Sequence, residues 1–571
     1  MKSKKTVLGC AVLALVATAG CNDNNNIGTS SPSAKRVLLI SVDGLHQADL
    51  AACLAANTCP TLAALAANGL TYSAAHTTTP SDSFPGLLSM VTGGTPKSTG
   101  VYYDDSYDRT LFAPGSGCAT GPTTGPGIEM VYDESVDYDF NFLFSGGMNP
   151  DNLPMAKNPT TGVCTRVYPH NFIKVNTIFE VVHESGGYTA WSDKHPTYDL
   201  VNGPSGKGVD DLYTPEINSP IANGGTANGV TLGPTLVAQC DGTTNSLPKS
   251  KVTDYTTCIP AVEAYDDVKV QAIINEIDGK NSNGSITTVV PEVFGMNFQE
   301  VSVGQKLPIG GYTDNKGTPN AQLAGVLAHT DASLGKMVAE LKAKNLLDST
   351  LIIISAKHGQ SPIDKTTLAM EVGSNAPVQT VQDPGDSLNT AKVTIDVQSS
   401  FKNPNTGNFY STNGHLQTDD TALIWLQDPG QTSAAVTQLT TDAAKIFANT
   451  LPAGTIWTSS INSGSALAAV YGDPTSSDPV AAARAPNILI QPNAGVIYSG
   501  SSKKIAEHGG GTVDDTNVAL IVSQTGLKAT TMSGTVSTTQ IAPTILKALG
   551  LDPTQLQAVQ KEGTVVLPGL F

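Results

Sequence analysis

Four side chains that can bind metal ions or attack phosphorus stand beside the ends of predicted strands and helices. Asp43 and His358 each follow a short apolar run and precede a glycine, while Ser83 stands where a helix is expected to begin. His508 lies in a glycine-rich loop ahead of a late apolar run. Carboxylate and imidazole are zinc ligands, and a serine hydroxyl at a helix N-terminus is placed to attack a phosphate. Each residue alone also has a plain structural interpretation, as a turn, a helix cap or a loop residue.

A second group of candidates lies in polar, aromatic segments. The segment 191–199, with Lys194 and His195, has the mixture of polar and aromatic residues typical of binding loops. Tyr102 and Tyr103 could form an aromatic pocket wall that stacks on a base. Tyr103, Lys194 and His195 are therefore predicted substrate contacts. An equal alternative is that these tyrosines pack the segment around them.

Apolar, β-branched runs alternate with segments of helical periodicity along most of the chain. Strands are predicted at 36–42, 188–191, 292–297, 349–355, 421–426, 487–490 and 518–523. Helices are predicted at 48–67, 83–91, 177–184, 264–277, 323–344 and 538–549. This alternation predicts an α/β fold with a mainly parallel central sheet. Functional residues gather at the carboxyl ends of strands in such sheets, where we expect Asp43, Asn297 and His358.

The order of these motifs resembles the type I phosphodiesterase/nucleotide pyrophosphatase family of the alkaline phosphatase superfamily. The similarity runs from about residue 36 to about residue 553, and its closing stretch 537–553 is similar to the C-terminal helix of that superfamily. The resemblance implies an alkaline phosphatase-like sandwich, with a central mainly parallel sheet flanked by helices. One catalytic domain over 36–571 is therefore expected, with loop-rich insertions at about 96–170 and 200–260.

The resemblance also implies a reaction. In that family two zinc ions hold a phosphate ester while a serine or threonine attacks phosphorus and forms a covalent intermediate. Carried over to this sequence, Ser83 is the nucleophile, and the expected metal ligands are Asp43, Ser83, His358 and His508. The implied activity is the metal-dependent hydrolysis of phosphate diesters or pyrophosphates of nucleotide type, with one or two zinc ions.

Three positions depart from the family pattern. Lys357 stands where the family has an aspartate, so it either turns away from the metal or itself supplies positive charge as a catalytic residue. Gln305 replaces a histidine and Val301 stands where an aspartate is expected, while Asn297 or Glu300 could supply oxygen ligands instead. Asn297 and Gln305 are also predicted substrate contacts. A catalytically reduced binding protein, and a phosphomonoesterase or phosphotransferase, therefore stay open as alternatives.

The charge composition of the chain limits the kinds of partner that it can bind. The chain has 571 residues and a formal net charge of −17, and such an acidic surface excludes binding along nucleic acid polymers. The predicted partner is a small phosphate ester, so positive charge must be concentrated at the site. Outside residues 6–20 no apolar stretch approaches the roughly 20 residues that span a bilayer. No feature of the sequence indicates an oligomeric state.

The N-terminal segment predicts export. Residues 1–20 combine lysines with an apolar stretch, and Thr18-Ala19-Gly20-Cys21 resembles the lipobox of bacterial lipoproteins. Cys21 would then carry lipid and provide the membrane attachment, and residues 21–35 would form a disordered tether. This predicts an exported lipoprotein at the outer membrane, the periplasmic face or the cell surface. An ordinary signal peptide or a short anchor helix is the alternative.

Six further cysteines suggest disulfide bonds in an exported protein. Six cysteines permit 15 pairings. We expect the sequential pairs because each closes a short loop: Cys53–Cys59, Cys118–Cys164 and Cys240–Cys258.

Overall fold

The computed structural model describes residues 34–120, 126–363, 369–372, 379–380, 392–393, 414–437, 460–491, 495–499 and 504–571. The predicted signal segment 1–20, with Cys21 and nearly all of the tether, lies outside these residues. No single described helix is long and apolar enough to cross a membrane. The helices α1 (Gln47–Ala56) and α2 (Pro60–Ala67) reach the required length and composition only together, and they are bent by 100° at their junction.

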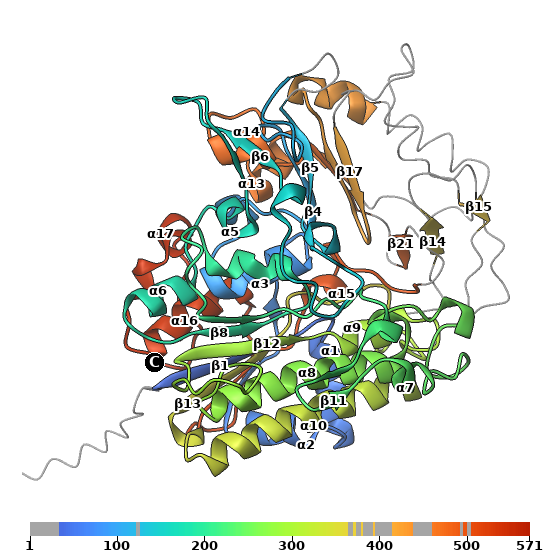
Figure 1. The fold of residues 1–571 in the computed structure, drawn as a ribbon, viewed down its shortest axis with the longest axis vertical. Coiled ribbons are helices and arrows are strands. Elements are labelled where there is room, and N and C mark those ends of the chain that lie inside the picture. Colours follow the sequence, from blue (N-terminus) through green and yellow to red (C-terminus); the bar gives the residue numbers. More distant parts are fainter. Residues whose placement is uncertain are drawn as a thin grey trace, which may run out of the picture.

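An eight-stranded sheet forms the centre of the molecule (Figure 1), in the order β23-β2-β22-β13-β1-β12-β8-β9. Its strands are β1 (Arg36–Val42), β2 (Gly69–Tyr72), β8 (Ala190–Ser192), β9 (Asp211–Tyr213), β12 (Val293–Phe298), β13 (Thr350–Ser355), β22 (Ile521–Ser523) and β23 (Thr530–Met532). Only β22 runs antiparallel to its neighbours, so the predicted mainly parallel sheet is confirmed. The predicted strand 518–523 is this reversed strand.

Helices cover both faces of this sheet. The first face carries α1, α2, α8 (Ile259–Ile277) and α10 (Ala321–Ala343). The second carries α3 (Ser83–Thr92), α6 (Ile178–Glu184), α16 (Ile541–Ala548) and α17 (Gln557–Glu562). Because successive strand residues point to opposite faces, Leu38 and Ile40 pack with the first set and Val37 and Leu39 with the second. Burial on both faces explains the continuous apolar run of β1.

The predicted helix 48–67 is two helices. Pro60 is the first residue of α2, and a proline at that place cannot continue the preceding helix because it lacks an N–H. α1 ends at Asn57, whose left-handed conformation (φ 55°) turns the chain. The two helices still deliver their apolar residues to one core, which includes Leu50, Leu62 and Leu65.

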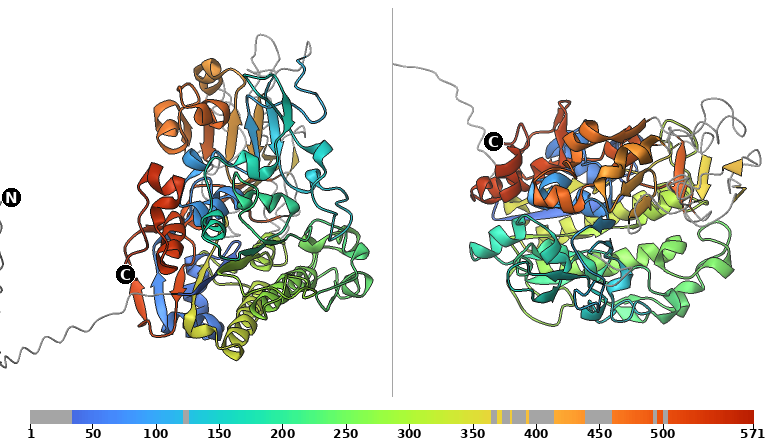
Figure 2. Two further views of the ribbon diagram at one scale, coloured as in Figure 1. Left: turned by 60° about the vertical axis from the view of Figure 1, so that its left-hand side comes forward. Right: turned by 90° about the horizontal axis from the view of Figure 1, so that it is seen from above.

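A smaller antiparallel sheet stands beyond one edge of the central sheet (Figures 1 and 2), in the order β17-β18-β20-β19. Its strands are β17 (His415–Thr418), β18 (Ala422–Trp425), β19 (Ser460–Ser463) and β20 (Ile488–Gln491). The hairpin of β4 (Asp105–Asp108) and β5 (Ile128–Val131) and the helices α13 (Gly464–Tyr471) and α14 (Pro479–Arg484) accompany it. The predicted strands 421–426 and 487–490 therefore pair with each other here and do not join the central sheet.

Shorter elements complete the described chain. The helices are α4 (Pro96–Thr99), α5 (Pro169–Phe172), α7 (Pro234–Val237), α9 (Glu300–Lys306) and α15 (Val513–Thr516). The strands are β3 (Ala75–His76), β6 (Met155–Lys157), β7 (Cys164–Arg166), β10 (Thr226–Ala227), β11 (Val230–Thr231), β14 (Ala369–Val372), β15 (Gln379–Thr380), β16 (Lys392–Val393), β21 (Val496–Ser499) and β24 (Val536–Ser537). The ranges 96–170 and 200–260, predicted as insertions, contain several of these short pieces together with β4, β5 and β9, and β9 is the end strand of the central sheet.

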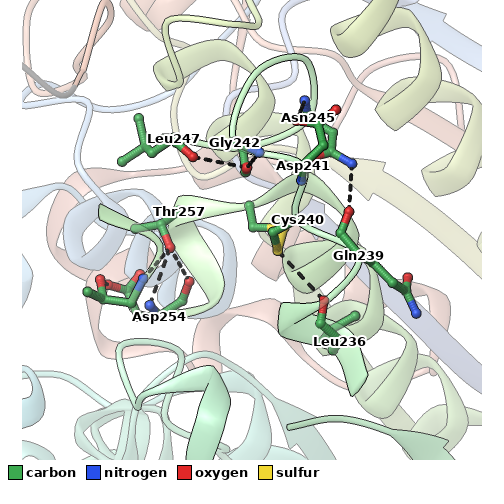
Figure 3. The surroundings of a disulfide bond; sticks show 12 residues. Leu236, Gln239, Cys240, Asp241, Gly242, Asn245, Leu247, Asp254 and Thr257 are labelled. Atoms are coloured by element: carbon green, nitrogen blue, oxygen red, sulfur yellow. Dashed lines mark hydrogen bonds between the residues drawn. A yellow bond between two sulfur atoms is a disulfide. The ribbon is translucent and has the colours of Figure 1, made fainter. Parts of the chain in front are cut away.

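Two of the three expected disulfide bonds form. Cys118 is joined to Cys164, and Cys240 to Cys258 (Figure 3). The expected third bond does not form, because Cys53 and Cys59 are free, buried thiols. The two thiols lie in contact across the junction of α1 and α2, and this contact, together with burial, raises the pKa of Cys53.

Candidate active site

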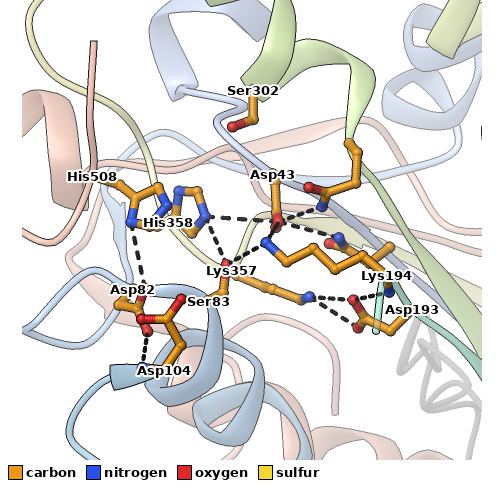
Figure 4. Close-up of polar contacts among 12 residues, drawn as sticks. Asp43, Asp82, Ser83, Asp104, Asp193, Lys194, Ser302, Lys357, His358 and His508 are labelled. Carbon is orange, nitrogen blue, oxygen red and sulfur yellow. Dashed lines mark hydrogen bonds and ion pairs between the residues drawn. The ribbon is translucent and has the colours of Figure 1, made fainter. Parts of the chain in front are cut away.

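Four neighbouring parallel strands and one helix bring polar residues together at one edge of the central sheet (Figure 4). The residues at these ends are Asp43 after β1, Ser83 at the start of α3, Lys194 after β8, Asn297 near the end of β12 and His358 after β13. Parallel strands end at the same edge, so residues far apart in the sequence become neighbours. The predicted convergence of Asp43, Ser83 and His358 is present, and Lys194 joins them.

Backbone contacts fix Asp43 at this edge. Its N–H donates to the carbonyl of Phe298 on β12 (3.0 Å), and the Gly44 N–H donates to the carbonyl of His358 (3.1 Å). Gly44 has φ of +80°, a conformation that favours glycine and that turns the chain sharply after the carboxylate. Asp43 is thereby tied to the two strands that flank β1.

The N-terminus of α3 presents Ser83. Asp82 caps the helix, with its carboxylate accepting the Phe84 N–H (3.2 Å), so the Ser83 hydroxyl is not used as the cap. A Cβ atom at Gly86 would collide with the backbone of Lys357, so glycine there lets α3 approach the end of β13. Close packing of these two elements places Ser83 opposite His358.

The Ser83 hydroxyl lies between a base and a cation. Its Oγ is 3.3 Å from Nε2 of His358 and 2.9 Å from Nζ of Lys194. Nδ1 of His358 donates to the Gly359 carbonyl (2.7 Å), which places the imidazole proton on Nδ1 and leaves the Nε2 lone pair facing Ser83. Burial, with the nearby Lys194 cation, lowers the pKa of His358 to about 3 although Asp43 acts in the opposite direction. His358 is therefore a neutral acceptor for the Ser83 proton.

His508 stacks against His358 on the far side of Ser83. The ring centroids are 4.0 Å apart, and His508 Nδ1 is 3.5 Å from Oδ1 of Asp82. Burial and the neighbouring His358 lower the pKa of His508 well below its usual range. His508 thus joins the site as a second neutral imidazole.

Asp43 is surrounded by N–H donors. Its Oδ2 accepts from the amides of Gln299 (2.6 Å) and Asn297 (3.2 Å) and from Lys194 Nζ (3.5 Å). Burial opposes ionisation, but the Lys357 and Lys194 cations outweigh it and hold the pKa of Asp43 below its usual range. Asp43 is therefore a buried carboxylate whose charge is balanced by lysine.

Lys357 does not face Ser83. Its Nζ binds both carboxylate oxygens of Asp193 (2.8 and 2.9 Å) and lies 4.1 Å from the ring centroid of Tyr198. Asp193 also accepts from the indole of Trp191 (3.0 Å). The Lys357 ammonium is therefore held by Asp193, while its charge still acts on Asp43. Lys194, expected only to contact substrate, is the ammonium at the nucleophile.

The spacing from Gln305 leads to Val301, whereas from the β12 side Asp43 meets two other residues. These are Asn297, which was one of the expected alternatives, and Gln299, which was not predicted. Val301, counted back four positions, is buried in the apolar core, and Gln299 contacts Asp43 instead. The offset arises because α9 begins at Glu300, directly after Gln299. Glu300 cannot substitute as a site ligand because it binds His329 and Thr330. A polar residue immediately after a strand was the signal available for Gln299.

Gln305 lies beside the site without opening onto a substrate cavity. Its amide donates to the Gly44 carbonyl (2.8 Å) and to the Tyr312 hydroxyl (2.8 Å). Tyr312 in turn contacts His46 and Asp49, which form a buried ion pair at 2.8 Å. Gln305 therefore supports the turn after Asp43, and its predicted contact with substrate does not follow from this placement.

The donor set does not fit the two zinc ions of the resembling family. At the first position Lys194 Nζ stands against Ser83 Oγ and Asp43 Oδ2, and Lys357 replaces the second carboxylate. At the second position the Gln299 amide nitrogen, rather than an anionic ligand, faces Asp43. Asp43 Oδ1, Asn297 Oδ1 and His508 Nδ1 are buried here without a hydrogen-bond partner among the described atoms. Zinc needs several anionic or imidazole ligands converging on one point, and here nitrogen donors occupy that point.

A cavity of about 440 Å³ reaches the site at Lys194 and His508. Its wall is mixed, with the polar residues Asp104, His195, Lys306, Asp419, Lys504 and Glu507 and the apolar residues Ile217, Leu247, Val303 and Leu307. Among its described lining residues there is no Phe, Tyr or Trp. His195 lines it and binds Glu216 through Nδ1 (2.8 Å).

The tyrosines considered as an aromatic wall pack the interior instead. Tyr102 and Tyr103 are buried in the core of the small sheet, and Tyr103 donates to Asp419 (2.9 Å) from behind the cavity wall. Tyr103 does not line the cavity, so its expected direct contact with substrate is not supported. Of the two interpretations of these tyrosines, packing of the insertion matches the structure.

Acidic and histidine side chains that could hold a metal ion gather at three places away from Ser83. The groups are Asp105 with Glu129 and His415, Glu134 with His195 and Glu216, and Glu263 with Glu300 and His329. The atoms within each group lie within 4.8 Å of one another. Each group also contains a close histidine–carboxylate contact.

A family model described as type I phosphodiesterase/nucleotide pyrophosphatase matches residues 37–135 and 189–512. These ranges contain Asp43, Ser83, Lys194, His358 and His508. Compared by sequence, no curated protein matches the chain. Among solved structures, murine ectonucleotide pyrophosphatase/phosphodiesterase 5 is similar, with 12% identity and a TM-score of 0.50 over 91% of this chain and 96% of that one. An inactive form of the same murine protein in complex with AMP gives 12% identity, the same two coverages and a TM-score of 0.51.

Proposed function

The chain belongs to the type I phosphodiesterase/nucleotide pyrophosphatase family of hydrolases, and from this premise we propose that it cleaves small phosphate diesters or pyrophosphates through a covalent intermediate on Ser83. The observation that carries the proposal is the Ser83 hydroxyl held 3.3 Å from the free Nε2 of neutral His358. A nucleophile within reach of an oriented base is the arrangement that covalent phosphoryl transfer requires.

The chain's own residues account for both halves of the reaction. His358 Nε2 takes the Ser83 proton as Oγ bonds to phosphorus, and the opposite P–O bond breaks. The leaving oxygen takes a proton from solvent. Water, losing a proton to solvent, then attacks phosphorus, the Oγ–P bond breaks, and His358 returns its proton to Ser83 Oγ. No step is assigned to zinc, because the donor set around Asp43 does not fit it.

Nucleotide-type substrates are the proposed class. The AMP complex of the murine relative belongs to that protein, and it motivates the choice without transferring a binding mode. The cavity supports a phosphate beside Lys194 and an organic group against Leu247 and Leu307. An attached base would pack on aliphatic side chains, since the described wall lacks Phe, Tyr and Trp. Oligomeric state plays no part in this proposal.

Export is proposed together with the activity. The disulfide bonds Cys118–Cys164 and Cys240–Cys258 are typical of proteins that leave the reducing cytosol. The lipobox-like ending at Cys21 supports lipid attachment at the outer membrane, the periplasmic face or the cell surface, with 36–571 as the catalytic domain. Mass spectrometry of the mature N-terminus tests this, since an unmodified Cys21 or an uncleaved segment 1–20 would contradict it.

The activity is tested by comparing wild-type protein with Ser83→Ala on bis(p-nitrophenyl) phosphate, p-nitrophenyl thymidine 5′-phosphate and p-nitrophenyl phosphate. We expect kcat on the diesters to fall by about 1,000-fold or more, because nucleophilic catalysis is lost. Ser135→Ala, at an exposed serine, is the matched control. A preference for the monoester would favour the phosphomonoesterase alternative. Absence of Ser83-dependent turnover on all three would favour a binding protein.

A further inference from the structure

An ammonium group occupies the place where the resembling family holds its first metal ion. Lys194 Nζ is 2.9 Å from Ser83 Oγ and 3.5 Å from Asp43 Oδ2 (Figure 4). In the family, the metal at this place binds both the nucleophile and the aspartate. We infer that Lys194 replaces that metal, so that Ser83 of this chain transfers phosphoryl groups without a bound metal ion. This inference rests on the proposed role of Ser83 as nucleophile.

The two lysines of the site already have carboxylate partners without a metal. Asp43 and Asp193 bring two negative charges, and Lys194 and Lys357 bring two positive ones, all within one network of contacts. A divalent ion would add two positive charges beside two buried ammonium groups, which is unfavourable.

The residues that stand in place of the family's metal ligands share one change in chemistry, because they donate hydrogen bonds. Lys357 stands in place of a metal-binding carboxylate, and Gln299 presents an amide nitrogen to Asp43. Lysine and amide N–H groups donate hydrogen bonds and do not bind cations. These two changes together put hydrogen-bond donors where metal ligands would be needed. Random loss of metal binding would not by itself place a cation against Ser83.

Lys194 can supply the electrostatic part of the metal's work. An ammonium has three N–H donors, of which Ser83 and Asp43 use two, and the third remains for a non-bridging phosphoryl oxygen. Lys194 lines the cavity, whereas the side chains of Asp43 and Ser83 lie behind it. A phosphoryl group entering the cavity therefore meets this ammonium on its way to Oγ.

The first experiment measures metal content and metal dependence. Purified wild-type protein is treated with 1,10-phenanthroline and EDTA, its zinc, manganese, calcium and magnesium are counted by mass spectrometry, and diester hydrolysis is assayed before and after zinc addition. We expect less than about 0.1 metal ion per chain to remain, and turnover to change by less than about twofold, because a lysine cation cannot be chelated away.

The second experiment replaces the ammonium. Lys194→Met should lower kcat/KM by about 100-fold or more, since removal of one oriented electrostatic donor typically costs 100- to 1,000-fold. Lys194→Arg keeps the charge and should retain more activity than Lys194→Met. In Lys194→Ala, added ethylamine should restore about fivefold or more by entering the vacated space with its own ammonium. Lys336→Met, at an exposed ion pair on α10, is the control, and circular dichroism verifies folding of each variant.

The outcomes separate this inference from the proposed function. Ser83-dependent turnover that is lost on chelation and restored by zinc would overturn the inference and leave the proposed function standing. Stoichiometric zinc retained by an active wild-type protein would do the same. Absence of Ser83-dependent turnover under every condition would overturn both. Unchanged turnover in folded Lys194→Met would also reject the inference, whatever the metal content.

Discussion

Lys194 follows β8 and Lys357 follows β13 at the same edge of the central sheet, but the two ammonium groups have different surroundings. Lys357 is fully buried, and both oxygens of Asp193 bind its ammonium. Lys194 is partly exposed to the cavity and directs its ammonium to Ser83. A cation whose partner lies wholly inside the protein holds the fold together, whereas a cation at a cavity remains available to a substrate. Whether a lysine stabilises the fold or can act on a substrate therefore depends more on where its partner lies than on the residue type.

The largest effect expected from this comparison is on stability. Lys357→Met leaves the Asp193 carboxylate buried without its cation, and breaking a buried pair in this way costs about 3 to 5 kcal/mol. Denaturant unfolding followed by tryptophan fluorescence measures the loss. Where the variant remains folded, we expect it to keep most of its diester hydrolysis.

The double variant Lys357→Met/Asp193→Asn is the control for this interpretation. It removes the uncompensated charge and leaves an amide that can still accept from the Trp191 indole. It should therefore recover more than half of the lost free energy of unfolding. A Lys357→Met protein that is as stable as wild type yet inactive would break the comparison, because Lys357 would then be the catalytic lysine.

A somewhat smaller loss of stability is expected from removing the disulfide bond that constrains the cavity wall. Cys240 and Cys258 are 18 residues apart, and the loop between them supplies Leu247 and Asp254 to the wall. Replacing both cysteines by serine should lower the free energy of unfolding by about 3 kcal/mol. It should also raise KM, because the wall loses its constraint, and steady-state kinetics measure this.

The Cys118–Cys164 bond provides the matched control for that change. Its serine double variant should lose about as much stability, since the bond closes a loop of 46 residues, but none of the described residues of that loop lines the cavity, so KM should stay unchanged. Equal KM values in all three proteins would show that the wall 246–257 does not position substrate.

The buried pair of His46 and Asp49 is another cation whose partner lies inside the protein, and its contribution to stability depends on pH. Burial alone would lower the pKa of His46, but Asp49, 2.8 Å from Nδ1, raises it to about 8. A histidine whose pKa rises on folding contributes stability that is full below its unfolded pKa, near 6.5, and is lost as pH rises through about 8. The shift corresponds to about 2 kcal/mol between pH 6 and pH 9.

Unfolding of wild type and Asp49→Asn at both pH values measures this contribution. The asparagine variant lacks the anion that raises the pKa of His46, so its stability should fall less between pH 6 and pH 9 than that of wild type. If both proteins lose the same free energy over this range, His46 is not a buried cation and the comparison does not extend to it.

The central strands were predictable because their sequences are determined by burial on both faces. β1 and β13 have continuous apolar runs for this reason, and the residues after them, Asp43 and His358, could be placed at one edge. The run 421–426 looks much the same but joins the small sheet. Local periodicity indicates burial but not which strands pair, so the sheet to which residues 421–426 belong could not be predicted.

The positions of Ser83 and His358 at the site were also predictable, although His358 was expected as a metal ligand and not as a base, and the roles of the two lysines were not predictable. Ser83 and His358 follow from the order of motifs. Lys194 and Lys357 both stand after predicted strands, and only the direction of each side chain distinguishes them. That direction depends on Asp193, whose carboxylate is matched to Lys357 in space across 164 positions of sequence. A contact of this kind leaves no local signal.

The smallest effect is expected at the other end of the cavity, where charge is shared. Lys306 Nζ lies 3.1 Å from Glu507, and Lys504 holds the second oxygen of the same carboxylate at 2.6 Å. Lys306→Met therefore leaves Glu507 paired, unlike Asp193 after loss of Lys357. Lys306 makes no hydrogen bond to Ser83, whose described side-chain partners include His358 and Lys194, so we expect its cation to attract an anionic substrate and not to stabilise the reacting oxygens. We expect KM to rise by about threefold, equivalent to about 0.7 kcal/mol, with kcat unchanged and the difference reduced at high salt. Steady-state kinetics at low and high ionic strength, with Lys336→Met as the surface control, measure this. A tenfold fall in kcat would place Lys306 with Lys194 among the groups that act on the reacting phosphate, and the functional end of the cavity would then span its whole length.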